Sequence, residues 1–317
     1  MLNKFWSSIP WHAPELAESG LTAEDWRNYA ILGMLPLLLA FEAPFARKEG
    51  RPGDYRQSYL ANVGTLVLND TLLSLFSISS LWCVAENYSE TGLLSGIANP
   101  WLQAALAFVL LDLALYFWHR ANHRFDWLWM FHKVHHSDRV MNATTAFRLH
   151  FVEVLMTVAL KALFIVAMGV KASVVMVNEA IITLFIMFHH TNLSFPGERR
   201  LGRFAIVPYL HRVHHSVKRE EHDRNYGAVF SWWDRMFGTL AEMKPAELGL
   251  KHVPGQNMLQ LVRFGFHRPA APSPKSLHAM IAEAAYYRAE KRGFTPGYEY
   301  CDWLEAEREI KGCELRP

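Results

Sequence analysis

Long apolar stretches constrain the fold of this chain more than any other feature. About 20 apolar residues in a helix cross the hydrocarbon core of a bilayer. Four or five stretches approach that length, and they are apolar around their whole circumference, which argues against the one-sided helices of a soluble bundle. We therefore predict an all-α integral membrane bundle of about four transmembrane helices, the last two forming a hairpin. The stretches are residues 29–46, 59–85, 100–118, 151–170 and 173–188.

Charges in the connecting segments predict the orientation of these helices. Residues 46–56 and 197–203 are rich in Lys and Arg, whereas residues 85–96 contain acidic residues and no basic one. An excess of Lys and Arg marks the cytoplasmic side of a membrane. Residues 119–150 and the chain from residue 190 onward are therefore predicted to form a helical cap on the cytoplasmic face.

Charge and cysteine content exclude several classes of protein. The net charge of +2 gives no basic footprint, so we expect no nucleic-acid partner. Cys83, Cys301 and Cys313 lack the spacing of zinc ligands, so neither a disulfide framework nor a cysteine metal site is expected. The N-terminus lacks the basic segment, apolar stretch and cleavage site of a secretory signal peptide.

Histidines gather at the cytoplasmic ends of the predicted spans. HKVHH at 132–136 returns as HRVHH at 211–215, and a histidine pair four residues apart follows the third apolar stretch. Positions three and four apart share one face of a helix, so each cluster can point at one centre. Neutral imidazole suits iron, zinc, copper and nickel. Eight or nine imidazoles exceed what one metal can hold, so we predict a site for two metals.

The histidines alone leave the chemistry open. Zinc would supply a Lewis acid for hydrolysis, but the sequence offers no His-Glu-x-x-His motif and no evident general base. A membrane metal-binding or transport protein would use histidines as transient ligands, although transporter sites lie near the bilayer midplane. Structural zinc closes with four ligands and would not need nine. A site at the membrane surface favours an enzyme that acts on a lipid.

Three motifs resemble the histidine boxes of the fatty acid hydroxylase and sterol desaturase superfamily. DRNYG and WDRMFGT are similar to the tail that follows the third box, in a layout like that of the alkylglycerol monooxygenase branch and of bacterial members. The resemblance covers roughly residues 55–240. It implies an integral membrane enzyme that uses dioxygen as co-substrate to hydroxylate or desaturate a lipid. The boxes are DLALYFWHRANH (112–123), HKVHHS (132–137) and HRVHHS (211–216).

The same resemblance implies two iron ions, for which zinc could substitute in purified protein. Some members carry a further ligand where this chain has Ile186, and a water or His222 could fill that position. His189 is expected outside the metal shell, and His150 and Glu153 near the site. Transferred to the matching positions, the metal ligands are His119, His123, His132, His135, His136, His190, His211, His214 and His215.

Four further residues are predicted to assist the metals: Asp112, Tyr116, Asp223 and Asn225. A metal-bound imidazole usually donates its other N–H to a carboxylate or carbonyl. Asp112 lies two helical turns before the first box on the same face, and Asp223 and Asn225 follow the third box. The alternative for Asp112 is a buried polar residue that pairs with another segment.

We predict four segments in the chain. An N-terminal segment with the first span (1–54) precedes the catalytic domain (55–240), a linker (241–276) and a small C-terminal helical module (277–312). The favoured function is hydroxylation of a C–H bond in a fatty acyl, sterol or ether lipid of the bacterial inner membrane, with desaturation on the same scaffold as the alternative. The sequence contains no dinucleotide fingerprint, haem motif or cysteine cluster. Electrons must therefore come from an external donor of the ferredoxin, cytochrome or reductase type.

Overall fold

A computed structural model describes residues 33–42, 44, 52–75, 81–267 and 277–314. The chain divides into two compact units, Met1–His267 and Arg268–Pro317. The described residues form helices, and their only β-type pairing consists of the isolated bridges Ala205–Phe230 and Ser216–Leu248. The predicted all-α class is confirmed.

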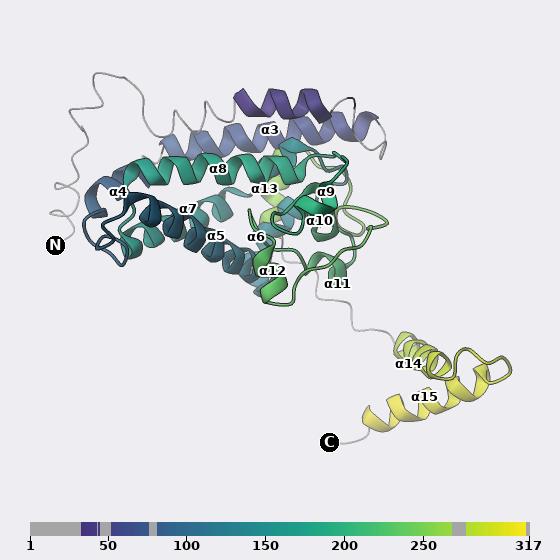
Figure 1. Cartoon of the computed structure of the whole chain (residues 1–317). Helices are drawn as coiled ribbons and strands as arrows, with labels where there is room; N and C mark the ends of the chain where they lie inside the picture. Colours follow the sequence, from purple (N-terminus) through teal and green to yellow (C-terminus); the bar gives the residue numbers. More distant parts are fainter. Residues whose placement is uncertain (1–32, 43, 45–51, 76–80, 268–276, 315–317) are drawn as a thin grey trace. The chain divides into compact units, whose positions relative to one another are not determined.

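Three described helices of the first unit are long and apolar enough to cross a membrane: α5 (Pro100–Arg124), α7 (Phe151–Met168) and α8 (Ala172–His190) (Figure 1). The Asn99 side chain accepts backbone N–H groups from the first turn of α5, as expected of a helix N-cap. At the end of α7, Gly169 adopts a left-handed conformation with φ 68° and turns the chain toward α8.

The hairpin of α7 and α8 contains an ion pair within its apolar stretches. Lys161 of α7 and Glu179 of α8 approach to 2.8 Å, and both side chains are largely buried. A lone charge within a membrane span is costly, and a partner of opposite charge reduces this cost. The short helix α4 (Leu81–Tyr88) packs against both α7 and α8.

The first two predicted spans differ from the helices observed there. Within residues 29–46 the described helix is only Gly33–Glu42. Residues 59–85 are divided between α3 (Pro52–Leu75) and α4, and residues 76–80 lie outside the described part. The reason that α3 is not apolar enough for a span lies in its buried face, where polar residues recur three or four positions apart. These residues are Ser58, Asn62, Thr65 and Asn69.

The segment between α5 and α7 and the segment after α8 contain short helices, which we call the cap (Figure 1). Helix α13, which lies in the segment expected as a linker, packs against α3 and α6 within the first unit. The helices of the cap are α6 (Asp126–His136), the 3-10 helix η1 (Ala143–Phe147), α9 (Glu198–Leu201), α10 (Pro208–His214), α11 (Arg219–His222), α12 (Trp232–Met236) and α13 (Met258–Phe266).

The second unit is a pair of helices, α14 (Leu277–Lys291) and α15 (Glu299–Glu314), that pack against each other. Gly293, with φ 66°, lies in the turn that follows α14. Arg288 of α14 pairs with Glu305 and Glu309 of α15. These ion pairs lie within the unit and join its two helices.

Candidate metal centre

Nine of the sixteen histidines converge in two groups where the ends of α5 and α8 meet the cap. Within each group the nitrogen atoms that could bind a metal all lie within 4.8 Å of one another. Eight of the nine side chains are buried, and His119 is partly buried. The structure thus brings together all nine residues that the sequence nominated as ligands. The first group is His119, His123, His132, His136 and His214, and the second is His135, His190, His211 and His215.

Helix geometry explains why His-x-x-His-His occurs twice. Residues four apart share a helix face, whereas adjacent residues are rotated by about 100°. In the second box, the outer pair His132 and His136 therefore joins the first group, and His135 between them joins the second. In the third box the assignment is reversed: the outer pair His211 and His215 joins the second group, and His214 joins the first.

In the second group, the Nε2 atoms of four imidazoles face one another at hydrogen-bonding distance. The Nε2 atom of His190 lies 3.1 Å from Nε2 of His135 and 2.9 Å from Nε2 of His211. Nε2 of His215 lies 3.2 Å from the same His211 atom. A neutral imidazole has one N–H and one lone pair, so four converging Nε2 atoms cannot all be satisfied by hydrogen bonds. A metal cation would satisfy all four lone pairs.

The first group contains buried nitrogens without hydrogen-bond partners. Nε2 of His123, His132 and His214 and both nitrogens of His136 are in this position. A buried polar atom left without a partner costs about 1–3 kcal/mol, so such atoms are rare unless a ligand binds them. The donor set of both groups therefore fits a metal ion.

Two carboxylates orient imidazoles of the first group from outside. The Nδ1 atom of His132 lies 2.6 Å from Oε1 of Glu153, and Nδ1 of His123 lies 3.0 Å from Oδ1 of Asp223. An N–H on Nδ1 leaves Nε2 as the lone pair that faces the group, the arrangement common around protein-bound metals. Asp223 thus contacts a candidate ligand in the way that the sequence suggested.

Backbone carbonyls orient three more imidazoles in the same manner. Nδ1 of His119 lies 2.9 Å from the carbonyl oxygen of Tyr226, and Nδ1 of His214 lies 2.7 Å from that of Arg224. Nδ1 of His190 lies 2.7 Å from the carbonyl oxygen of Ile186, one turn earlier in α8. Sequence reasoning did not find these partners, because a backbone carbonyl leaves no mark on residue identity.

Burial keeps the imidazoles of the cap uncharged. Desolvation is the largest cause that lowers the pKa of His135, His136, His211, His214 and His215 well below 6.5, and neighbouring histidines lower the pKa further. These side chains are therefore neutral at neutral pH. Neutral imidazole is the form that binds metal ions, so the centre is prepared for a cation.

Asp112 holds the loop that follows the third box. Its carboxylate accepts the backbone N–H groups of Val229 and Phe230, at 2.9 and 3.1 Å, and the indole N–H of Trp233 at 2.8 Å. The sequence left two roles open for this residue, and the observed hydrogen bonds are those of a buried polar residue that pairs with another segment. Asp112 fixes the loop that supplies the carbonyl of Tyr226 to the site.

Tyr116 and Asn225 act on the same loop. The Tyr116 hydroxyl lies 2.9 Å from Oγ1 of Thr239. Asn225 has a left-handed backbone with φ 54°, donates to the carbonyls of Leu210 and Ala241, and accepts the N–H of Ala241. These hydrogen bonds go to other parts of the cap and not to an imidazole. We therefore describe Tyr116 and Asn225, with Asp112, as positioning residues.

Two other histidines lie at the edge of the centre. His222, His123 and Asp223 form a third set whose ligand atoms lie within 4.8 Å of one another. The Nδ1 atom of His222 lies 3.0 Å from the carbonyl oxygen of Ser216. The ring of His189 lies 4.0 Å from that of His211, and its Nδ1 is buried without a hydrogen-bond partner. His189 belongs to neither of the two main groups.

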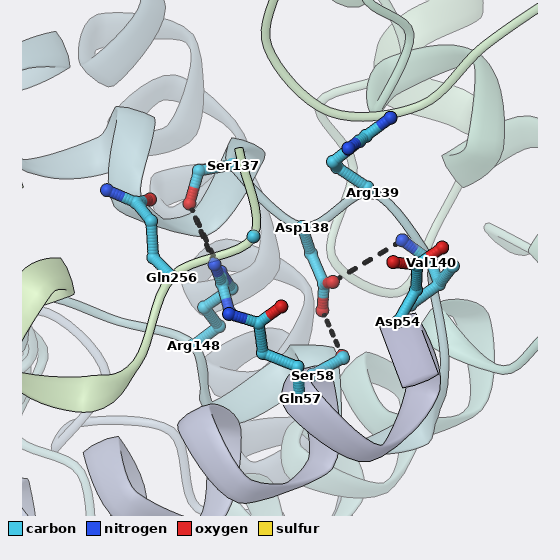
Figure 2. Close-up of a pocket in the computed structure, with 10 residues that line it drawn as sticks. Asp54, Gln57, Ser58, Ser137, Asp138, Arg139, Val140, Arg148 and Gln256 are labelled. Atoms are coloured by element: carbon cyan, nitrogen blue, oxygen red, sulfur yellow. Dashed lines mark hydrogen bonds between the residues drawn. The ribbon is translucent and has the colours of Figure 1, made fainter. Parts of the chain in front are cut away.

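A polar network next to the second box was not anticipated from the sequence, and Figure 2 shows four of its members, Ser58, Ser137, Asp138 and Arg148. Asp138 accepts hydrogen bonds from Ser58 at 2.7 Å, Asn62 at 3.1 Å and Thr145 at 2.9 Å. The buried Arg148 guanidinium donates to the side chains of Ser137 and Asn62 and to the carbonyl of Val134. This network fixes the end of α6 to α3. The polar positions at helical spacing in residues 58–69 are the one sequence signal that could have revealed it.

Comparison with known proteins identifies the domain that contains the centre. Residues 104–239 match the family model described as fatty acid hydroxylase, and residues 276–312 match one described as a protein of unknown function (DUF2934). The first match contains all nine histidines. The second coincides with the helical pair of the second unit. No solved structure resembles the chain closely enough to count as a match.

The curated relatives that the chain matches have the names of lipid monooxygenases and hydroxylases. Alkylglycerol monooxygenase of Homo sapiens is 29% identical over 227 residues, which are 69% of this chain and 48% of the relative. The Danio rerio protein of the same name is 32% identical, over 53% of this chain and 38% of its own length. The ornithine lipid hydroxylase of Rhizobium tropici is 31% identical, over 43% and 41%. The chain thus spans less than half the length of each.

The matched family, the three relatives and the two histidine groups lead to one assignment. Both groups lie at the ends of apolar helices long enough to span a membrane, as expected of an integral membrane protein. The histidine boxes that sequence reasoning recognised fall inside the matched residues 104–239. Residues 104–239 thus form a fatty acid hydroxylase domain, and the chain is similar to named members of the fatty acid hydroxylase and sterol desaturase superfamily.

Proposed function

We propose that this protein is a membrane-bound, dioxygen-dependent monooxygenase that holds two iron ions and hydroxylates a C–H bond of a lipid. The observation that carries the proposal is the division of nine imidazoles into two groups of converging nitrogens. Named monooxygenases and hydroxylases among the relatives favour hydroxylation over desaturation. We further propose that the protein lies in a bacterial inner membrane, in line with its resemblance to bacterial members, and that the centre is on the cytoplasmic face, as the charges of the connecting segments indicate.

The five imidazoles of the first group would hold one iron ion, and the four of the second group would hold the other. Iron bound with open coordination positions supplies the redox chemistry that activates dioxygen for attack on a C–H bond. The protein contributes a fixed, dry enclosure. Glu153 and Asp223 hold protons at Nδ1 of His132 and His123, so that Nε2 of each ring stays available to the metal.

The position of the centre suits a lipid substrate. His119 and His123 lie in the last two turns of α5, and His190 is the last residue of α8. Both helices are candidate membrane spans, so an alkyl or acyl chain could reach the centre from the bilayer without crossing water. His119 is the one partly exposed member of the two groups, which makes its side of α5 the proposed approach for substrate.

Electrons would come from a separate protein. A monooxygenase reaction places one oxygen atom in the product and the other in water, and it consumes two electrons and two protons. The sequence contains no fingerprint for a dinucleotide, haem or iron–sulfur group. The proposed donor is therefore a ferredoxin, a cytochrome or a reductase.

Comparison of lipid extracts would test the function. Cells grown in air would express the native chain, the variant His135→Ala with His214→Ala, or the control His252→Asn. The double variant removes one imidazole from each group, whereas His252 is exposed and its left-handed backbone, with φ 62°, tolerates asparagine. High-resolution mass spectrometry would follow every lipid class.

A lipid that gains one oxygen atom in cells with the native chain and the control, but not with the double variant, would support the proposal and identify the substrate class. A lipid that loses two hydrogen atoms under the same conditions would establish a desaturase instead. Purified native protein that binds neither iron nor another divalent metal would refute the metal centre itself.

A further inference from the structure

We infer that Glu42 is a positioning residue for the second histidine group. It connects the N-terminal helix Gly33–Glu42 to the segments that carry His190 and His211. This inference rests on the proposed metal centre, because it assigns a role toward that centre. Glu42 lies outside residues 104–239, the part of the chain that matches the fatty acid hydroxylase family. A role in the site therefore extends the centre beyond the histidine boxes.

The Glu42 carboxylate joins two segments that are distant in sequence. Oε2 accepts the backbone N–H of Ala143 at 3.1 Å, and Oε1 accepts the backbone N–H of Asn192 at 3.0 Å. Glu42 is only 3% exposed, so both bonds are shielded from water. Hydrogen bonds to a carboxylate oxygen are stronger than those between neutral groups.

One of the two partners lies close to a candidate ligand. Asn192 follows His190 by two residues, directly after the end of α8, and Ala143 begins η1 after the second box. The Asn192 side chain extends the connection, because its Oδ1 accepts a hydrogen bond from Nη1 of Arg212 at 3.0 Å. Arg212 directly follows His211 in α10. Glu42 is thus joined through Asn192 to the segments that carry two of the four imidazoles in the second group.

The helix that carries Glu42 also packs against η1 and α8 through apolar side chains. Met34, Leu35 and Leu38 pack against a small core cluster that includes Phe147 of η1 and Met187 of α8. Both carboxylate oxygens of Glu42 are hydrogen-bonded, as a buried carboxyl group requires.

A carboxylate is the side chain that this position requires. Two backbone N–H groups point at Glu42, and a carboxylate offers an acceptor oxygen to each. Glutamine has the same shape but only one acceptor, so its amide N–H₂ would face one of the two N–H groups. Glu42→Gln therefore removes one connection without creating a cavity. The exposed Glu90, changed to Gln, is the matched control.

Cobalt(II) binding to the detergent-solubilised full chain would test the inference. In a His214→Ala background the intact group is the second, and in a His135→Ala background it is the first. Glu42→Gln and Glu90→Gln would each be introduced into both backgrounds. The readouts are the cobalt content, the visible spectrum of the bound ion and the rate of its release to a chelator.

We expect Glu42→Gln to accelerate release from the second group by about tenfold, the lower end of the loss caused by removing a direct partner of a metal ligand, because Glu42 acts on the ligands only through Asn192. Its spectrum should change, while release from the first group and all Glu90→Gln values should match those of the parent background. The metal-free variant should retain the helical circular dichroism of its parent and a cooperative melting transition, at a somewhat lower temperature because one buried hydrogen bond is lost.

Three outcomes would overturn the assignment: unchanged release from the second group, equal acceleration in both groups, or a metal-free Glu42→Gln variant that is unfolded. The last two would make Glu42 a general structural residue. Absence of cobalt from the native chain is a separate result, because it would refute the metal centre and not the role of Glu42 alone.

Discussion

Adjacent histidines serve different groups in both boxes. His135 and His136 belong to the second and first groups, and His214 and His215 belong to the first and second. The spacing of histidines was enough to nominate these residues from the sequence, because residues three or four apart on a helix share a face. The division between the groups was not predictable. It depends on how α6 and α10 are rotated about their axes, which only packing determines.

Glu153 is the residue with the shortest contact to a candidate ligand, at 2.6 Å from Nδ1 of His132. We expect Glu153→Gln to weaken metal binding in the first group by about 10–100-fold, because the neutral amide supports the imidazole less strongly than a carboxylate does. Metal content after dialysis against a graded series of chelator concentrations would measure this change. Equal loss from the second group, which Glu153 does not contact, would contradict the assigned role.

At the scale of elements, α3 shows where sequence reasoning was insufficient. Its many apolar residues led us to expect a membrane span, whereas its buried face is polar and bonds to the chain between α6 and α7. Thr65 donates to the carbonyl of Phe147, and Asn69 donates to that of Leu149. The partners lie about 80 residues away, and no local pattern specifies such pairings. The ends of α5 and α7, in contrast, follow from residues in the sequence, Asn99 with Pro100 and Gly169.

Replacement of Asn62 would test the importance of this polar face. Asn62 donates to Ser58, Asp138 and Thr144 and accepts from Arg148. We expect Asn62→Leu to lower the free energy of unfolding by about 2–4 kcal/mol, because it leaves buried polar partners unsatisfied. Denaturant titration in detergent would measure the loss. The control Asn87→Leu is exposed and donates one hydrogen bond within α4, so an equal loss there would refute the explanation.

At the scale of the molecule, one unit contains the whole centre. All nine histidines of the two groups lie in Met1–His267, and the ion pairs of the second unit are internal to it. Buried imidazoles that lie close together bind protons weakly, because burial and mutual repulsion both disfavour the charged form. The free energy of folding is therefore linked to pH through the centre.

We expect the metal-free protein to lose stability in acid. Burial holds the pKa of His135, His136 and His214 well below 6.5 in the folded chain, whereas an unfolded imidazole titrates near 6.5. Below about pH 6.5 the unfolded chain binds more protons than the folded chain, so the free energy of unfolding decreases as the pH falls. Above about pH 6.5 these imidazoles are neutral in both states, so they no longer change the free energy of unfolding with pH.

Melting temperatures of chelator-treated protein between pH 7.5 and pH 5 would measure this dependence. Metal-loaded protein should resist the change until protons compete for its ligands. A melting temperature of the metal-free protein that is constant over this range would contradict the burial of neutral imidazoles.

The reversed division of the two boxes gives the centre an approximate twofold symmetry. The second box gives two imidazoles to the first group and one to the second, and the third box gives one and two. Helices α5 and α8 break this symmetry, because α5 adds two imidazoles to the first group and α8 adds one to the second. Two chemically identical ions would therefore be inequivalent, with five nitrogen donors around one and four around the other. The position with fewer donors has more room for a small external ligand.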